Sequence, residues 1–170
     1  MESLLFVNAE GTFSVLRTSR KYSAVSAAGL RFGVVAATYN PEFGDALLSN
    51  CLDTLAKAGA DTRDICVVRV PGSFEVTAAA AHLAKRGQCD CVIGLGILLQ
   101  GETHHAHYIA NAVAHGLTNV AIQTGVPTIF GIVAANNIKQ ARVRCVGKHH
   151  NRGREAALAA IQMARLWKNI

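Results

Sequence analysis

Three histidines, His104, His105 and His107, follow a short glycine-containing turn at residues 101–103. The apolar run before this turn, residues 89–99, is typical of a buried strand, and the residues after it have the pattern of a helix. A strand, a glycine turn and a helix start point unpaired backbone N–H groups at a ligand, which favours an anion. Imidazole can carry a proton near neutral pH. The segment therefore predicts a phosphate site with a proton carrier beside it.

Metal binding is the main alternative for these side chains. His104 and His107 are spaced i, i+3 and could share a helical face, but no carboxylate or thiolate stands at a matching offset. The cysteines are odd in number, contain no C-x-x-C pair and lie mostly in apolar segments, at Cys51, Cys66, Cys89, Cys91 and Cys145. This pattern favours reduced, packed thiols in a cytoplasmic protein. We expect no metal site and no cofactor.

Length and charge limit the class of protein. The 170 residues, 51% of them hydrophobic, suffice for one core and are too few for two ordinary domains. No apolar run approaches the roughly 20 residues that span a bilayer, and residues 1–20 lack a signal-peptide core, so we expect a soluble protein without membrane contact. Residues 139–170 carry eight Lys or Arg against Glu155 alone, which favours anions or a solvated helix face. No aromatic residues interleave with these charges, so we expect no nucleic-acid partner.

Apolar runs alternate with helical patterns from residue 31 onward. Expected strands are residues 31–38, 65–70, 89–99 and 127–133. Expected helices are residues 41–58, a segment capped by Ser73 that ends near 87, and about 104–124, 137–145 and 151–167. This alternation predicts a four-stranded parallel sheet with helices on both faces, a three-layer α/β/α fold. Residues 1–30 have no sustained period and are expected to form an N-terminal arm or one peripheral strand before a single domain at 31–170; a transit peptide is an alternative, against which Glu2 and Glu10 argue.

Ligands bind outside the carboxyl ends of the strands in such sheets. The loops expected there contain Tyr39, residues 72–75, residues 101–105 and the segment just after Phe130. They offer aromatic faces, a carboxylate, helix-start donors and imidazole. Ordinary packing is the alternative for Tyr39 and Phe74, a favourable helix-end charge for Glu75, and a plain N-cap for Thr103.

Several separated motifs carry a family resemblance. They are Gly72-Ser73-Phe74-Glu75, Gly101-Glu102-Thr103 with His105 and Tyr108, Thr124-Gly125-Val126-Pro127, residues 129–133, Gln140-Ala141 with Arg144, and Asn151-Arg152-Gly153 with Glu155. In this order and spacing, over residues 31–168, the chain resembles the 6,7-dimethyl-8-ribityllumazine synthase family. The resemblance implies a flavodoxin-like fold and the penultimate step of riboflavin biosynthesis. In that step 5-amino-6-ribitylaminouracil condenses with 3,4-dihydroxy-2-butanone 4-phosphate to give the lumazine, phosphate and water, without a cofactor.

The resemblance also implies roles for individual residues. Tyr39 stacks on the pyrimidine, while Ser73, Phe74 and Glu75 hold the pyrimidine and the ribityl chain, and Ile97, Leu98 and Leu99 line the pocket. Glu102, Thr103 and Arg144 bind the phosphate, His105 carries the proton, and Arg152 and Glu155 are charged residues near the site. Phe130 comes from a neighbouring subunit, because the family forms pentamers and in some members a shell of twelve pentamers. Riboflavin synthase is a further candidate partner.

Departures from the family pattern occur at Thr38, Gln100, Ala106, His107 and Arg152. None removes a group that the chemistry needs, although Ala106 in place of an aromatic residue loosens the wall beside the catalytic histidine. Two other classes of function stay open at this point. One is a module of the flavodoxin type that binds a phosphate ligand or a flavin without turnover, and the other is a structural shell paralogue.

Overall fold

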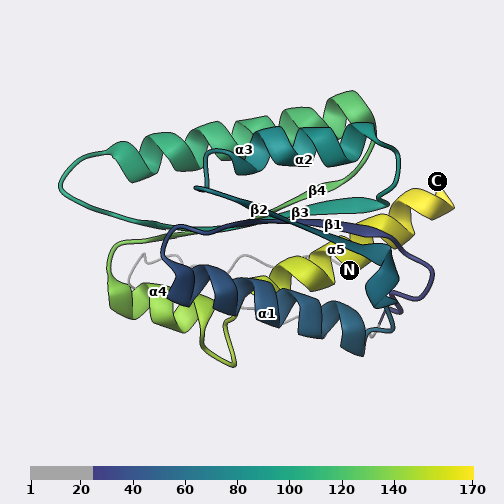
Figure 1. Cartoon of the computed structure of the whole chain (residues 1–170), viewed down its shortest axis with the longest axis horizontal. Helices are drawn as coiled ribbons and strands as arrows, with labels where there is room; N and C mark the ends of the chain where they lie inside the picture. Colours follow the sequence, from purple (N-terminus) through teal and green to yellow (C-terminus); the bar gives the residue numbers. More distant parts are fainter. Residues whose placement is uncertain (1–24) are drawn as a thin grey trace, which may run out of the picture.

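The structure, a computed structural model, describes residues 25–170 (Figure 1). The strands are β1 (Phe32–Ala37), β2 (Ile65–Val70), β3 (Cys91–Leu99) and β4 (Thr128–Ala135). The helices are α1 (Pro41–Lys57), α2 (Val76–Lys85), α3 (His105–Thr124), α4 (Ile138–Cys145) and α5 (Arg152–Asn169), with a short 3-10 turn, η1, at Thr62–Asp64. Most of the segment expected as an N-terminal arm, and the alternative of a transit peptide, lie outside the described residues.

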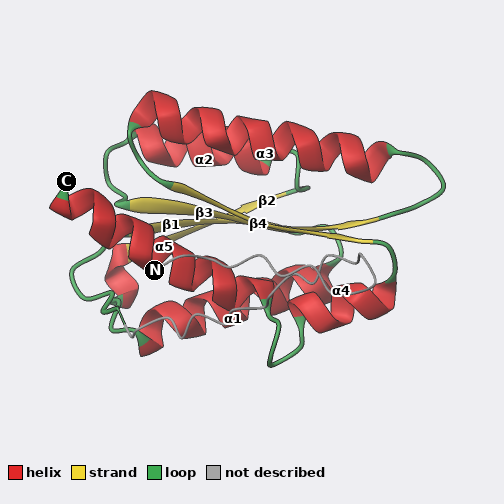
Figure 2. Cartoon of the chain, turned by 180° about the vertical axis from the view of Figure 1, so that it is seen from behind, coloured by secondary structure: helices red, strands yellow, loops and turns green. Residues whose placement is uncertain are grey.

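All four strands are parallel and lie in the order β2-β1-β3-β4. Helices α2 and α3 cover one face of the sheet, and α1, α4 and α5 cover the other (Figures 1 and 2). The predicted three-layer α/β/α fold is therefore confirmed. Among the described helices none is both long and apolar enough to cross a membrane.

The two central strands explain why the sequence folds in this way. Every residue of β1 is buried, and all of β3 is buried except the half-buried Leu99. Strands that are covered on both faces read as continuous apolar runs, as these do. One core cluster joins Phe32 and Ile93 to α1 and α5, and a second joins Val35 to α2 and α3. The edge strands β2 and β4 each expose several side chains.

Two local predictions were wrong. Helix α2 begins at Val76, and Ser73 does not cap it, because its buried hydroxyl is directed to the carbonyl of Ile97 instead. Strand β4 continues to Ala135, so the segment just after Phe130 is not a loop at the carboxyl edge. Phe130 lies inside the strand, paired with Gly94 of β3.

Residues 25–30 are tied to the domain. Ala27 and Leu30 are fully buried, and the Ala27 N–H donates to the Ala58 carbonyl at 2.8 Å. The Arg165 guanidinium of α5 donates to the carbonyls of Ser26 and Ala28 at 2.9 and 2.6 Å. These contacts fasten the chain ahead of β1 to the last turns of α1 and α5.

Candidate functional site

The exits of β1 and β2 present two exposed aromatic side chains. The backbone N–H groups of Thr38 and Tyr39 donate to the carbonyls of Val70 and Pro71 at 2.8 and 3.0 Å, so the two loops are joined. The Tyr39 side chain is 71% exposed and that of Phe74 is 59% exposed. Two large aromatic residues left in water on joined loops can stack on a planar ring.

The loop before α2 packs closely against β3. Ser73 is 4% exposed, and its hydroxyl donates to the Ile97 carbonyl at 3.4 Å. This approach requires Gly96, because a Cβ atom there would collide with the Ser73 hydroxyl. Glu75 is exposed, and its carboxylate folds back to within 2.9 Å of the place that a Cβ on Gly72 would occupy.

The end of β3 lies beneath this loop. The Ile97 and Leu98 side chains are buried in two different core clusters, on opposite faces of the sheet, and Leu99 is half-buried. These residues can therefore offer a ligand mainly their backbone groups.

The turn after β3 is held by Gln100, a residue whose role the sequence did not reveal. Its side-chain amide donates to the carbonyls of Gly101 and Thr103 at 2.9 and 2.7 Å. With the carbonyls turned inward to this amide, the turn is fixed just before α3. The signal in the sequence is an amide directly ahead of a glycine turn.

The start of α3 is open to a ligand. Its N-cap residue, His104, makes no side-chain capping hydrogen bond. The Thr103 hydroxyl accepts from the His105 N–H at a long 3.4 Å, and Glu102 is exposed. Unpaired N–H groups at the positive end of a helix of 20 residues form a favourable environment for an anion.

The three histidines differ in their contacts. His107 is engaged, because its Nε2 pairs with the Asn111 side-chain amide at 3.0 Å and its ring meets Tyr108 edge-on at 6.4 Å. The ring of His105 is exposed, and no hydrogen bond to it is found within residues 25–170. Over the same residues no three His, Cys, Asp or Glu side chains are grouped closely enough to hold a metal ion.

Arg144 lines a hollow of about 620 Å³ beside the carboxyl end of β4. The hollow lies between that strand end and α4, whose first turn is capped by the Asn137 side chain accepting from the Gln140 N–H at 2.9 Å. The Gln100 N–H donates to the Ala135 carbonyl at 2.9 Å, which joins the turn after β3 to the edge of this hollow. No ion pair of Arg144 is found in the described part of the chain, whereas Arg142 pairs with Glu42 at 2.8 Å.

Three further predicted site residues do not lie at the turn after β3 in a single chain. They are Phe130, Arg152 and Glu155. Arg152 and Glu155 pair with each other at 2.7 Å in the first turn of α5. Phe130 is 42% exposed on the edge strand β4, at the third of its eight residues, and so lies away from the carboxyl edge. Within residues 25–170 no hydrogen bond or ion pair links Phe130, Arg152 or Glu155 to the turn after β3.

The fold and this edge define a class: a parallel α/β protein, covered on both faces, whose strand ends offer aromatic surfaces and an anion-binding helix start. A sequence model of the family described as 6,7-dimethyl-8-ribityllumazine synthase matches residues 29–168. A relative of that name from Aquifex aeolicus (strain VF5) is 42% identical over 146 residues, which cover 86% of this chain and 95% of the relative. The chain belongs to the 6,7-dimethyl-8-ribityllumazine synthase family.

Proposed function

We propose that this protein is an enzyme of riboflavin biosynthesis that condenses 5-amino-6-ribitylaminouracil with 3,4-dihydroxy-2-butanone 4-phosphate. The products are 6,7-dimethyl-8-ribityllumazine, inorganic phosphate and water. Membership of the family supports this reaction. The structural observation that carries the assignment is the start of α3, where His104 makes no capping hydrogen bond and the exposed His105 imidazole stands at the first residue of the helix.

Phosphate binding occurs at the turn after β3. The backbone N–H groups of Glu102 and Thr103 point to the phosphate of the second substrate, and the helix end adds its positive potential. Arg144 supplies a charge-assisted hydrogen bond from the adjoining hollow. Its lack of an intrachain ion pair among the described residues supports this role, because no carboxylate there competes for the guanidinium.

His105 transfers protons during the reaction. The amine of the pyrimidine adds to the ketone and loses water to give an imine, phosphate is eliminated, and ring closure completes the lumazine. Each step moves a proton, which an imidazole held beside the phosphate can accept and return. Holding both substrates at one edge also removes the entropic cost of bringing them together.

The pyrimidine binds at the exits of β1 and β2. The ring of Tyr39 stacks on it, with Phe74 beside it on the joined loop. Glu75 offers acceptor atoms to the ribityl hydroxyls, and Ser73, whose hydroxyl is buried against Ile97, offers the pyrimidine its backbone groups. The backbone groups of Ile97, Leu98 and Leu99 form the floor of the pocket.

A second copy of the chain completes this pocket. Phe130 of one subunit covers the edge of the next, and Arg152 and Glu155 lie near the same contact. Exposed apolar side chains at Ile122, Ile138 and Trp167 support burial between subunits. The assembly is a pentamer or a shell of twelve pentamers in the cytoplasm, and riboflavin synthase is a candidate partner.

The test combines activity with mass. Both substrates are mixed with the protein, and formation of the fluorescent lumazine is followed against the spontaneous condensation. We expect a rate that rises in proportion to protein concentration, whereas a rate equal to the spontaneous one would reject the enzyme and leave a binding or shell protein. Light scattering gives the mass of the assembly, and a monomeric mass would reject the shared pocket.

A further inference from the structure

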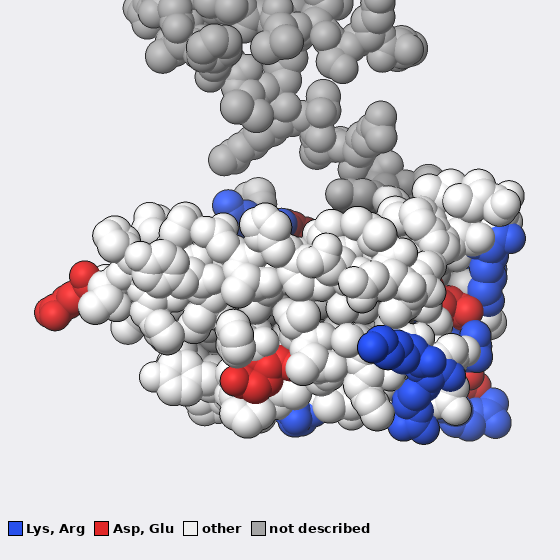
Figure 3. Space-filling model, turned by 90° about the horizontal axis from the view of Figure 1, so that it is seen from above, with Lys and Arg blue, Asp and Glu red and all other residues white. Residues whose placement is uncertain are grey.

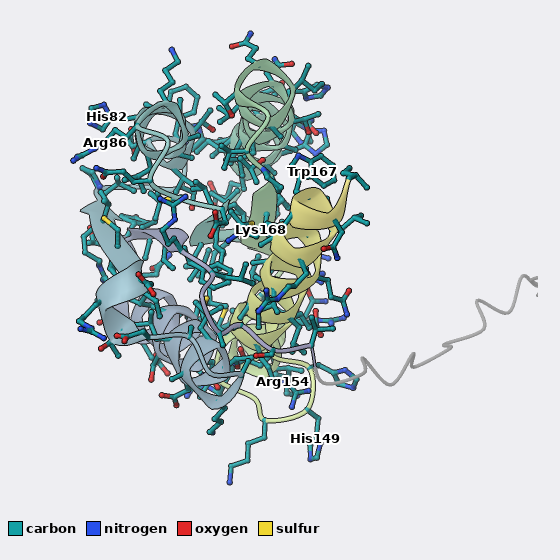
Figure 4. The ribbon with its side chains drawn as sticks, turned by 90° about the vertical axis from the view of Figure 1, so that its right-hand side faces the viewer. His82, Arg86, His149, Arg154, Trp167 and Lys168 are labelled. Atoms are coloured by element: carbon teal, nitrogen blue, oxygen red, sulfur yellow. The ribbon has the colours of Figure 1, made fainter. Side chains whose placement is uncertain are left out.

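A second hollow lies at the opposite edge of the sheet, where the strands begin. Its volume is about 200 Å³, and the residues that line it include Arg31, Arg63, Cys66, Leu83, Arg86 and Cys89. Figure 4 looks onto this end of the molecule, with Arg86 projecting at the end of α2. The proposed substrate site lies at the other edge, so this hollow needs an explanation of its own.

Two thiols flank an open space in this hollow. Cys66 of β2 is paired in register with Gly33 of β1, and residues paired in this way project to the same face of a sheet. A Cβ atom on Gly33 would lie 3.1 Å from the Cys89 sulfur and 3.0 Å from Leu83. The Cys89 sulfur therefore lies over Gly33, beside the Leu83 and Val92 side chains, on the face of the sheet to which Cys66 projects.

The two thiols also differ in access. Cys66 is exposed, whereas Cys89 is 7% exposed and burial raises its pKa. The other cysteines, Cys51, Cys91 and Cys145, are fully buried, and burial raises the pKa of each. A reagent from solution therefore meets Cys66 first, and only Cys89 stands beside it.

We propose that Cys66 and Cys89 form a reversible dithiol–disulfide centre that reacts with small disulfides bearing carboxylates. The Cys66 thiol loses its proton, and its sulfur attacks one sulfur of the reagent, forming a mixed disulfide. The leaving thiolate takes up that proton. The Cys89 thiol then loses its proton, and its sulfur attacks the Cys66 sulfur; the second half of the reagent leaves as a thiolate and takes up that proton to become a thiol. Two protein thiols are oxidised, and one external disulfide is reduced to two thiols.

Charge at the rim of the hollow favours an anionic reagent. Arg31 pairs with Asp90 at 3.1 Å and Arg63 with Asp61 at 2.6 Å, but no ion pair of Arg86 is found within residues 25–170. Lys and Arg side chains gather at this end of the molecule (Figure 3). A guanidinium without an ion pair attracts a carboxylate on the reagent.

The experiment treats the full-length assembled protein with oxidised glutathione, blocks the remaining thiols and maps them by mass spectrometry. We expect a peptide pair linked through Cys66 and Cys89, removed by a reductant, with Cys51, Cys91 and Cys145 still reduced. In Cys89→Ser the reaction stops at glutathione bound to Cys66, and Cys66→Ser stays unmodified. Since serine at buried position 89 could disturb folding, Cys89→Ala and an assembly measurement accompany it. A wild-type protein that keeps glutathione on Cys66, or does not react there, overturns the proposal.

The choice of reagent tests the role of charge. We expect Arg86→Gln to slow the reaction with oxidised glutathione about threefold, the effect of one exposed ion pair, and to leave the reaction with cationic cystamine unslowed. Lys85→Gln, one residue earlier, is the matched control and should react as the wild type does. Equal slowing by both substitutions, or equal slowing with both reagents, would reject recognition by Arg86.

Discussion

Asp90 at the amino edge of the sheet and His105 and Arg144 at the carboxyl edge differ in how fully their side chains are paired. At the amino edge, Asp90 accepts from the Arg31 N–H at 2.7 Å and pairs with the Arg31 and Lys168 side chains at 3.1 and 3.2 Å. This network ties the entries of β1 and β3 to the end of α5. At the carboxyl edge, the His105 ring and the Arg144 guanidinium have no such partners among residues 25–170.

The difference separates groups that stabilise the fold from groups that are free for a ligand. A carboxylate that already receives several hydrogen bonds is committed to the folded state. The His105 imidazole, the Arg144 guanidinium and the exposed rings of Tyr39 and Phe74 contribute little to folding. They can be used in binding. Substitutions in the Asp90 network should therefore affect mainly stability, and substitutions of His105 and Arg144 should affect mainly catalysis.

The largest expected effect is that of His105→Ala at the carboxyl edge of the sheet. Loss of the proton carrier should lower the enzymatic rate of lumazine formation about 100-fold, the usual contribution of a positioned acid or base. Assembly and unfolding should stay as in the wild type, because the ring is exposed and receives no hydrogen bond from residues 25–170. His107→Ala is the control, since His107 is engaged with Asn111. Equal losses in the two variants would contradict the assignment of His105.

Arg144→Ala should weaken use of the phosphorylated substrate. Removing one charge-assisted hydrogen bond should raise its KM about tenfold, with a smaller change in the KM of the pyrimidine. Steady-state kinetics with each substrate varied in turn would measure this split. Arg142→Ala, on the same helix but paired with Glu42, is the matched control. An unchanged KM in Arg144→Ala would reject the proposed hydrogen bond from Arg144 to the substrate phosphate.

The next prediction concerns Asp90 at the amino edge of the sheet. Burial raises the pKa of Asp90, but the hydrogen bonds from Arg31 and Lys168 together outweigh burial and bring the pKa below its ordinary 3.8. A carboxylate with a lowered pKa stabilises the fold above pH 3.8, and this stabilisation is lost as the pH falls through the folded-state value. Asp90→Asn should therefore lower the free energy of unfolding by about 1–2 kcal/mol at pH 7 and weaken its acid dependence below pH 3.8.

Denaturant unfolding at several pH values would measure both changes. Asp45→Asn is the control, because Asp45 pairs with Arg69 at a position where 60% of the carboxylate side chain is exposed. Exposed pairs contribute little, so this variant should unfold nearly as the wild type does. If Asp90→Asn left stability unchanged while lowering activity, the proposed division between the two edges would be wrong.

Much of this organisation was predictable from the sequence, for a physical reason. Central parallel strands are covered on both faces, so β1 and β3 appear as continuous apolar runs, and the intervening helices imply parallel pairing. The carboxyl edge then follows from topology alone. The family resemblance supplied the roles of individual residues, which periodicity cannot provide.

The errors come from contacts between distant residues. Ser73 has the type and place of an N-cap, but its hydroxyl is directed to Ile97, 24 residues away, across the gap left by Gly96. The end of β4 was missed because alanines such as Ala135 favour a helix and are uncommon in strands. The hollow beside Arg144 depends on how α4 packs against β4, which no local pattern contains.

Gln100→Ala should have the smallest effect. It tests whether the hydrogen bonds of the Gln100 amide hold the turn after β3 in the conformation that binds phosphate. The substitution removes both hydrogen bonds to the turn carbonyls, so the N–H groups at the start of α3 lose their fixed direction. We expect kcat/KM for the phosphorylated substrate to fall about fivefold and inhibition by inorganic phosphate to weaken similarly. The free energy of unfolding should change little, because the turn is exposed.

Inhibition by phosphate distinguishes positioning from a general loss of structure. Gln123→Ala near the other end of α3 removes a similarly exposed amide and should leave phosphate inhibition as it is in the wild type. Gln100→Glu should be worse than Gln100→Ala, because a carboxylate would face the two carbonyls and repel the phosphate. If all three variants bound phosphate equally, the turn would not depend on this amide. Phosphate binding at the carboxyl edge would then depend on the start of α3 and on Arg144, without a contribution from Gln100.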